Sequence, residues 1–302
     1  MKARDFLALV RIPTVFSSMS NAYAGYFLAG GREISPRLAA ALLAAGLFIM
    51  AGMALNDVAD KDVDARERPT RPIPSGAVPL SLAWNLSLGM MILGLVLLAW
   101  ANPVSLWAGS ALCAAIFAYN FLVKGTAFGP AAMGLCRALN LLTGMSLTWS
   151  ALPTGADLLN PALWPKSMWL ALLSLWAYIA LVTFLARDEV GGNTRRRLWL
   201  FLAGLVGWAL LWPVSGLDRF RSEPLMALAW LALGLFLRGP LRNLATDPSP
   251  KHTGQMVGAM LRLVPLVDVI AMLANHVPPP FALAGALWIL PAFAVGKWFY
   301  ST

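Results

Sequence analysis

Charged residues are scarce in this chain of 302 amino acids. Asp, Glu, Lys and Arg together make up 12% of it, about half of their share in an average soluble domain. Apolar residues make up 59%, and the mean hydropathy is +0.69. A soluble domain of this size could not hide so much apolar surface, because much of its accessible surface has to be polar. The composition therefore excludes a disordered chain and an ordinary soluble enzyme, and it indicates an integral membrane protein.

Cysteine and histidine are rarer still, with two of each. Cys113 and Cys136 lie in apolar stretches, and we interpret them as small core residues rather than a disulfide or metal pair. His252 and His276 are isolated, and two lone histidines do not make a metal site. These counts exclude a small disulfide-stapled domain. No small-residue cleavage site follows the first apolar stretch, so we expect no cleavable signal peptide.

Acidic residues are the scarcer charge, with 14 Asp and Glu against 23 Lys and Arg. On a soluble chain the net charge of +9 would suggest a nucleic-acid partner. Here we expect none, because membrane proteins collect basic residues in their cytoplasmic loops. The apolar segments of the chain end alternately on two sides of the membrane. The ends on one side carry fifteen basic residues: Lys2, Arg4, Arg11, Lys61, Arg66, Arg68, Arg71, Lys124, Arg187, Arg195, Arg196, Arg197, Arg238, Arg242 and Lys251. The ends on the other side carry five: Arg32, Arg37, Lys166, Arg219 and Arg221. We therefore expect a protein of a bacterial inner membrane whose N-terminus and acidic motifs face the cytoplasm.

Apolar runs long enough to cross a membrane recur along the whole chain. They lie near residues 13–31, 37–56, 80–101, 104–123, 129–150, 167–186, 198–215, 224–239, 255–274 and 280–299. The run at 255–274 is interrupted by Arg262, Pro265 and Asp268, whose charges could pair with each other or mark an interfacial segment. The pattern predicts an all-α, polytopic membrane bundle of about nine transmembrane helices, with ten possible. We expect residues 1–302 to form a single domain.

An acidic cluster follows the second apolar run. On a helix turning about 100° per residue, Asn56, Asp57, Asp60 and Asp64 fall within one arc of about 100°. Three carboxylates on one face repel each other and are costly to desolvate at the end of a membrane helix. Hard oxygen ligands of this kind favour Mg²⁺, whose remaining positions go to water and phosphate. The alternative is a solvated loop in which these acids pair with Lys61, Arg66 and Arg68.

The segment Arg68 to Gly76 reads Arg-Pro-Thr-Arg-Pro-Ile-Pro-Ser-Gly. Alternating prolines predict an extended backbone. Arg68 and Arg71 could then approach a phosphate that the metal already holds and add charge-assisted hydrogen bonds. Positive-inside anchoring of the chain explains the two arginines equally well.

These residues resemble the first aspartate-rich motif, NDxxDxxxD, of the UbiA superfamily of intramembrane prenyltransferases. Tyr119, Asn120 and Lys124 after the fourth run, and an acidic site after the sixth, extend the resemblance over most of the chain. The segments GMALNDVADKDVDARERPTRPIPSG, GLCRALNLLTGMS and FLARDEVGG are also similar to the EboC-like branch of that superfamily.

The resemblance implies a helical bundle in which Mg²⁺ and two acidic motifs bind a prenyl diphosphate. Ionisation would give an allylic carbocation that alkylates a hydrophobic acceptor, often an aromatic one. Elementary chemistry agrees, since diphosphate leaves readily only when its developing charge is neutralised. Water would quench the carbocation, so a dry apolar chamber is required. Membrane lipids would surround that chamber and admit the prenyl tail laterally.

The second acidic site departs from the superfamily pattern, which usually carries two or three aspartates at helical spacing. This chain has Asp188 and Glu189, and the residue four positions after Asp188 is Gly192. The resemblance implies that Asp188 acts in catalysis and that Asp188 and Glu189 hold a second metal. The lower charge leaves a non-catalytic, lipid- or precursor-binding or transport component as the alternative function.

Polar residues inside the apolar runs are further candidates for substrate binding. Lys124 matches the basic residue that the superfamily places near the diphosphate, although an interfacial lysine would look the same. Arg137 and Asn140 lie one turn apart in the fifth run, and a buried arginine in a membrane helix is usually functional or paired. We expect Arg137 to face the cavity, the alternative being a partnership with an acid on another helix. Asn21 in the first run could line the acceptor pocket or join two helices.

We therefore predict a membrane prenyltransferase with Asp57, Asp60, Asp64 and Asp188 in catalytic roles and Mg²⁺ as cofactor. One other class of enzyme and one class of transporter fit the sequence less well. The DGxxAR-type motif of CDP-alcohol phosphotransferases is absent from the sequence. Paired discontinuous half-repeats, which would indicate a secondary transporter, are not visible.

Overall fold

The computed structural model describes residues 3–150, 166–187, 194–222 and 224–300. Every regular element in this part of the chain is a helix, so the prediction of an all-α bundle is confirmed. The elements are α1 (Ala3–Leu9), η1 (Ile12–Thr14), α2 (Val15–Leu28), α3 (Pro36–Ala59), α4 (Lys61–Glu67), α5 (Leu80–Ala101), α6 (Ser105–Ala118), η2 (Tyr119–Val123), α7 (Gly129–Met145), η3 (Ser146–Thr148), α9 (Lys166–Ala186), α10 (Arg195–Ser222), α11 (Pro224–Thr246), α12 (Pro250–Arg262), α13 (Val264–Ala274), α14 (Pro279–Ala286) and α15 (Ile289–Tyr300).

Each of the ten predicted apolar segments overlaps one of these helices or a successive pair of elements. Among the described residues, five helices are long and apolar enough to cross a membrane: α3, α5, α6 with η2, α9 and α11. The count becomes six if α12 and α13 are one bent span. Their axes differ by 42° at the break around Leu263. Pro265 follows the break and has no backbone N–H to donate to the preceding turn, which explains why the helix does not continue straight.

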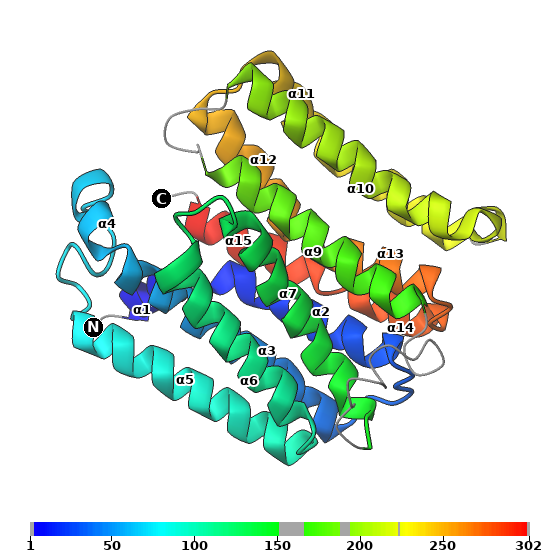
Figure 1. Cartoon of the computed structure of the whole chain (residues 1–302), viewed down its shortest axis with the longest axis horizontal. Coiled ribbons are helices and arrows are strands. Elements are labelled where there is room, and N and C mark those ends of the chain that lie inside the picture. The colour runs from blue at the N-terminus through cyan, green and yellow to red at the C-terminus, as the bar shows by residue number, and fades with distance from the viewer. Residues whose placement is uncertain (1–2, 151–165, 188–193, 223, 301–302) are drawn as a thin grey trace.

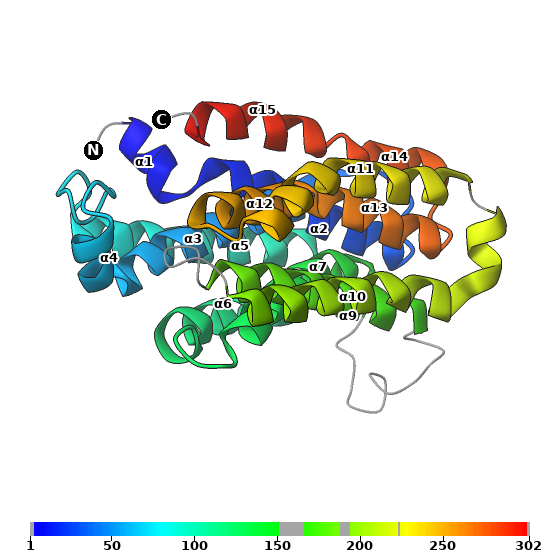
Figure 2. The same ribbon diagram turned by 90° about the horizontal axis from the view of Figure 1, so that it is seen from above.

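The helices pack side by side along one direction (Figures 1 and 2). α2 lies at the centre and packs against α3, α7 and α13. α3 packs against α5, and α5 against α6. From α6 the packing continues through α7 and α9 to α10 and α11, and α11 returns to α12 and α13. Helices far apart in the sequence, such as α2 and α13, therefore share one interior.

Local sequence signals account for the ends of α3. Ser35 precedes the helix in an extended conformation, and its hydroxyl accepts a hydrogen bond from the Leu38 amide at 3.3 Å. Pro36 follows at the first helical position, where its missing amide hydrogen costs nothing. The helix then runs for 24 residues, enough to cross the hydrocarbon core, and ends at Ala59. This length carries the acidic cluster to one end of the bundle.

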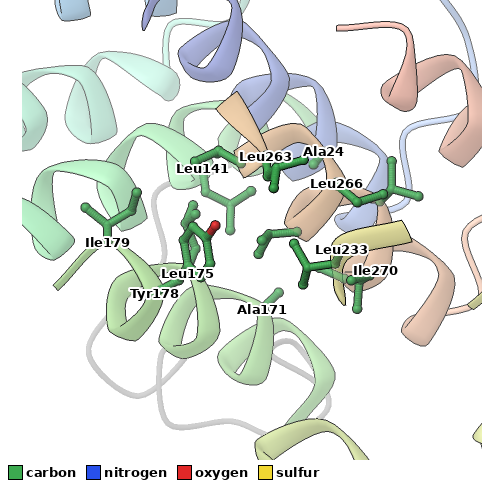
Figure 3. Close-up of a cluster of buried hydrophobic side chains, with 14 of the residues drawn as sticks. Ala24, Leu141, Ala171, Leu175, Tyr178, Ile179, Leu233, Leu263, Leu266 and Ile270 are labelled. Atoms are coloured by element: carbon green, nitrogen blue, oxygen red, sulfur yellow. The ribbon is translucent and has the colours of Figure 1, made fainter. Parts of the chain in front are cut away.

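Two clusters of buried apolar side chains form the core. The larger one combines mainly residues of α2, α7 and α9 to α13. In Figure 3, Leu175, Tyr178 and Ile179 of α9 lie near Leu141 of α7 and Leu263. The Tyr178 hydroxyl donates a hydrogen bond to the Met260 carbonyl at 2.9 Å, which satisfies its polar atom inside this core. The smaller cluster joins α1, α3, α5 and α6.

Small residues let α2 and α7 approach closely. A Cβ atom added at Gly144 would lie 1.9 Å from the Ala22 carbonyl oxygen, and one at Gly25 would lie 2.0 Å from the Leu141 carbonyl oxygen. Only hydrogen fits at these two positions, so the two backbones can touch. This contact brings the polar residues of α2 against those of α7.

We expect Gly144→Ala to destabilise the bundle, because the new methyl group must push α2 away from α7. Overpacking of this kind costs about 1–3 kcal/mol. Gly89→Ala on α5 is the matched control, since a Cβ there meets no atom within 4 Å. Thermal unfolding of the detergent-solubilised protein should show a lower midpoint for Gly144→Ala only. Equal midpoints for the two variants would contradict the close contact.

Candidate active site

The acidic cluster lies at the junction of α3 and α4. Asn56 and Asp57 occupy the last turn of α3, Asp60 stands between the helices, and Asp64 lies in α4. The backbone leaves helical geometry at Asp60, with φ −90° and ψ 4°. The one-turn spacing survives this break, because the Asp60 amide bonds the Asn56 carbonyl at 3.0 Å and the Asp64 amide bonds the Asp60 carbonyl at 2.8 Å. The cluster is therefore not one continuous helical face, but its residues keep their predicted register.

Two arginines balance the two buried carboxylates of the cluster. Asp57 and Asp64 are only 2% and 3% exposed. Arg71 reaches both, with Nη1 at 3.4 Å from Asp57 Oδ1 and at 2.5 Å from Asp64 Oδ2. Arg11 adds a contact of 3.0 Å between its Nη2 and Asp57 Oδ1. A buried carboxylate without such partners would be strongly destabilising.

The third carboxylate pairs with a lysine from another helix. Asp60 forms an ion pair with Lys124 at the end of the α6–η2 segment. Burial lowers the pKa of the Lys124 ammonium group, and its hydrogen bond to Asp60 acts in the opposite direction. Asn56 donates to the Asn120 side chain at 3.1 Å, so two polar contacts join the end of α3 to the end of α6.

The oxygen ligands of this cluster suit a hard divalent cation. Among the described residues, no group of three or more His, Cys, Asp or Glu side chains converges on one point that could hold a metal. The acids face their basic partners instead. The ion pairs of Asp57 use only Oδ1 and that of Asp64 only Oδ2. Each carboxylate therefore keeps one oxygen that could ligate Mg²⁺ or one of its waters.

The segment from Arg68 to Gly76 is a series of turns, and the predicted extended backbone is wrong. The Arg71 amide bonds the Arg68 carbonyl, and the Ser75 amide bonds the Arg71 carbonyl, both at 3.0 Å. Proline restricts φ to a value that suits turns as well as extended chain, so alternating prolines alone do not decide between them. The turns direct Arg71 back to the carboxylates. Arg68 makes no ion pair within the described part of the chain.

A π-helical turn shapes the other side of the cluster. In η2 the Lys124 amide bonds the Tyr119 carbonyl, five residues back, at 2.9 Å. Such turns are rare and occur often at functional sites. Tyr119 and Asn120 begin this turn, and both are buried. They stand between two hollow regions of the molecule.

The first hollow region is an open cleft of about 1490 Å³. Its described lining carries one acid, Asp60, and three basic residues, Lys124, Arg187 and Arg197. Arg187 also donates to the Thr126 carbonyl, and the Arg197 guanidinium lies 5.2 Å from the centre of the Phe184 ring. This excess of positive charge suits an anion such as a phosphate. The predicted second acidic site, Asp188 with Glu189, lies outside the described residues.

The second hollow region is an apolar cavity inside the bundle, which measures about 480 Å³ together with the open space at its mouth. It is lined by Ser18, Phe48, Ile49, Gly52, Met53, Asn56, Leu112, Ile116, Tyr119, Asn120, Met133, Cys136, Arg137 and Asn140. Tyr119 and Asn120 line the cleft as well, so the two hollow regions share one wall. The arrangement places an apolar chamber beside a polar, positively charged cleft.

A buried polar network connects α2, α7 and α13. Arg137 donates to the Asn21 side-chain oxygen at 3.2 Å and to the Ser17 hydroxyl at 3.1 Å. Asp268 accepts hydrogen bonds from Asn21 at 2.9 and 3.0 Å and from Ser20 at 2.6 Å. Asn21 thus bridges a buried guanidinium and a buried carboxylate. Arg137 lines the cavity, and Asn21 links it indirectly to an acid on another helix.

Sequence reasoning missed the roles of two residues. From the sequence, Arg11 served only to predict the orientation of the chain in the membrane, although Arg11 contacts Asp57, 46 positions away. Its backbone is left-handed, at φ 47° and ψ 58°, a conformation that costs about 1–3 kcal/mol in a non-glycine residue and clusters at functional sites. Asp268 bonds Ser20 and Asn21, and no ion pair with Arg262 appears among the described residues. Its position inside an apolar run was the available signal.

Comparison with known proteins gives a family match over most of the chain. A model of the UbiA prenyltransferase family matches residues 18–253. The chain is 31% identical over 282 residues to the protoheme IX farnesyltransferase of Synechococcus elongatus, which covers 88% of this chain and 86% of that protein.

Matches to two digeranylgeranylglyceryl phosphate synthases are shorter. Identity to the enzyme of Metallosphaera sedula is 36% over 141 residues, covering 46% of this chain and 50% of that relative. Identity to the enzyme of Sulfolobus acidocaldarius is 32% over 97 residues, covering 32% of this chain and 35% of the relative. The chain thus spans half or less of the length of these two relatives.

Solved structures of UbiA homologues have the same fold. The homologue from Archaeoglobus fulgidus bound to DMAPP and Mg²⁺ aligns with a TM-score of 0.58 at 17% identity, covering 96% of this chain and 98% of that one. The homologue from Aeropyrum pernix K1 aligns with a TM-score of 0.56 at 19% identity, covering 95% and 99%. At such low identity the likeness shows the fold alone.

We expect Arg71→Ala to destabilise the protein strongly in the absence of metal, because two buried carboxylates lose the cation they share. Breaking buried pairs of this kind costs about 3–5 kcal/mol. Arg68→Ala, three residues away on the same turns, is the matched control and should change the free energy of unfolding by at most about 0.5 kcal/mol. Thermal unfolding of the two variants in detergent with EDTA measures these changes.

Adding Mg²⁺ should raise the unfolding midpoint of Arg71→Ala more than that of the unmodified protein, since the ion would replace the missing positive charge. Two results would show that Arg71 does not balance the cluster. One is an equal loss of stability in Arg71→Ala and Arg68→Ala, and the other is an equal rise of the midpoint with Mg²⁺ in Arg71→Ala and the unmodified protein.

Proposed function

The chain belongs to the UbiA prenyltransferase family, and from this premise we propose that it moves an isoprenyl group from a Mg²⁺-bound prenyl diphosphate to a hydrophobic acceptor. We also propose that residues 1–302 form one catalytic domain. The observation that carries the proposal is the shared wall at Tyr119 and Asn120, with a basic cleft on one side and an apolar chamber on the other. A prenyl diphosphate has the same two-part character, an anionic head and an apolar tail.

The cleft side would hold the diphosphate. In this proposal Asn56, Asp57, Asp60 and Asp64 hold Mg²⁺, and Asp188 with Glu189 holds a second ion. When bound, Mg²⁺ neutralises the charge that develops on the departing diphosphate. The three described basic residues of the cleft support this assignment, because they add fixed positive charge to the cleft that Asp60 lines.

The basic residues would orient the diphosphate from several elements at once. Lys124 and Arg71 each contact a carboxylate of the cluster, so both stand next to the proposed metal site. Each can transfer a hydrogen bond from its carboxylate to a phosphate oxygen when the metal arrives. Arg68, which has no ion pair among the described residues, would provide a further donor from the same turns.

The chamber side would exclude water from the reacting carbon. Its walls include Phe48, Met53, Ile116 and Met133. Phe48 and Ile116 offer no nucleophile to an allylic cation, and the face of an aromatic ring such as that of Phe48 attracts a cation.

The relatives support this proposal through their own activities. The Synechococcus relative is a farnesyltransferase, and the Archaeoglobus fulgidus homologue was solved with DMAPP and Mg²⁺. Neither identifies the acceptor of this chain. On the three segments quoted above, we propose that the chain belongs to the EboC-like branch of the superfamily.

The chain is an integral membrane protein, as members of this family are. We propose that the acidic cluster opens to the cytoplasm of a bacterial inner membrane. The asymmetry of basic residues supports this orientation. In both views α1, near the N-terminus, and α4, which follows the cluster, lie at the same end of the bundle (Figures 1 and 2).

The proposal is tested by incubating the purified protein with labelled prenyl diphosphates, Mg²⁺ and a membrane lipid extract. We expect a labelled lipid product from the unmodified protein. Asp60→Asn should lower the rate by about two orders of magnitude or more, because a charged ligand of the proposed Mg²⁺ is lost. Asp62→Asn is the matched control, since Asp62 is exposed on α4 and belongs to no ion pair among the described residues.

Unfolding midpoints of both variants should stay close to that of the unmodified protein, which separates loss of activity from loss of fold. Full activity of Asp60→Asn would exclude the proposed site. Mg²⁺-dependent binding of prenyl diphosphate without any product would instead favour the non-catalytic binding function.

A further inference from the structure

Exposed basic side chains gather at one end of α10 and α11. The two helices run in opposite directions along the bundle (Figures 1 and 2). They meet at the rings of Trp208 and Trp230, whose centroids lie 5.5 Å apart. Counted from these rings at 1.5 Å per residue, Arg196 on α10 and Arg242 on α11 both lie about 18 Å towards the same end. The two arginines therefore stand at one level of the bundle.

One exposed face of α11 changes from apolar to basic along its length. It carries, at spacings of three and four residues, Leu228, Leu231, Leu235, Arg238 and Arg242. Leu235 is 60% exposed although it is apolar. In a membrane protein such a face lies against lipid, and its basic end marks the level at which acyl chains give way to head groups.

The first turns of α10 repeat this order. Arg195 and Arg196 are exposed, and the side chains four residues further along the helix, Trp199 and Leu200, are exposed as well. Trp199 is 69% exposed, and tryptophan is typical of the membrane–water interface. The first turn of α10 has no acidic residue, and arginines there meet the positive end of the helix dipole. This placement is unfavourable for the helix alone and indicates an anion outside the chain.

No acid of the described part of the chain neutralises these basic residues. The ion pairs there include none of the five exposed basic side chains at this end, which form the basic band: Arg195, Arg196, Arg238, Arg242 and Lys251. Asp247 is the single acidic residue in the sequence of α11, α12 and their connecting turn, and its carboxylate contacts His252 at 3.0 Å. The band therefore presents a surplus of positive charge.

We propose that the basic band binds the phosphate groups of anionic phospholipids, whose acyl chains lie along the apolar faces of α10 and α11. Exposed apolar side chains beside the charges favour a lipid over a free phosphate, because a soluble anion would use the charges alone. Arg197 lines the cleft and lies about 200° around the helix from Arg195. The lipid surface and the proposed diphosphate site are thus separate, and this inference is independent of prenyl transfer.

Trp199 is a local reporter for the test. The full-length protein is placed in detergent micelles with phosphatidylglycerol or phosphatidylcholine whose acyl chains carry bromine, which quenches nearby tryptophan fluorescence. The difference between the unmodified protein and Trp199→Phe isolates the Trp199 signal. We expect the anionic lipid to half-quench this signal at a roughly thirtyfold lower mole fraction, which corresponds to about 2 kcal/mol for two arginines. Equal quenching by the two lipids would overturn the inference.

Arg195→Gln combined with Arg196→Gln should abolish most of this preference, whereas Arg195→Lys with Arg196→Lys, which keeps both charges, should retain it. Lys61→Gln with Arg66→Gln is the matched control, since it removes the same charge from exposed positions on α4. It should also retain the preference. A preference that survives in the α10 glutamine variant, or that falls equally in the α4 control, would contradict binding at the band.

Unfolding midpoints of all variants are measured in the same micelles. If the α10 glutamine pair does not fold, Arg196→Gln alone should lower the preference about fivefold. A molar excess of glycerol 3-phosphate, which carries the phosphate without acyl chains, should leave the quenching unchanged. Relief of quenching by this soluble anion would indicate a general anion site and overturn the lipid assignment.

Discussion

Every charge inside this bundle has to be balanced locally, because a membrane interior does not solvate ions. The structure meets this requirement with one local partner, Arg71, and with partners from other helices. Asp57 and Asp64 share Arg71, Asp60 pairs with Lys124, and Asp268 is linked to Arg137 through Asn21. The Lys124 contact joins the end of α3 to the α6–η2 segment, and the Asn21 contacts join α2 to α7 and α13. The high cost of an ion in a membrane interior explains both why charged residues are few and why each buried carboxylate in the described part of the chain has a partner.

The balance of charge also divides the interior into two kinds of space. Where Asp60 and three basic residues gather, the bundle opens into a polar cleft, and where the described lining is mostly apolar it forms a cavity whose one charged residue is Arg137. The π-helical turn at Tyr119 and Asn120 stands at the boundary. A substrate with an ionic head and an apolar tail can occupy both spaces at once. The chemistry proposed for the site follows from this division more than from any single residue.

Much of the fold could be predicted, since long apolar runs have few alternatives to helices in a membrane. The spacing of Asn56, Asp60 and Asp64 was also predictable, because hydrogen bonds four residues apart persist across the break at Asp60. The backbone after Arg68 was predicted wrongly, since proline suits turns as well as extended chain. The role of Arg11 depends on a contact 46 residues away, for which the sequence carries no local signal.

By itself, the sequence determined that this chain is a helical membrane protein, where its apolar segments lie, and which residues form its acidic motif. Periodicity and composition suffice for these features because each depends on neighbours within a few turns. Only the tertiary structure decided which cation balances each acid and that Asn21 bridges Arg137 and Asp268. These features depend on how α2, α7 and α13 pack, and helix packing is set by side chains that are distant in sequence.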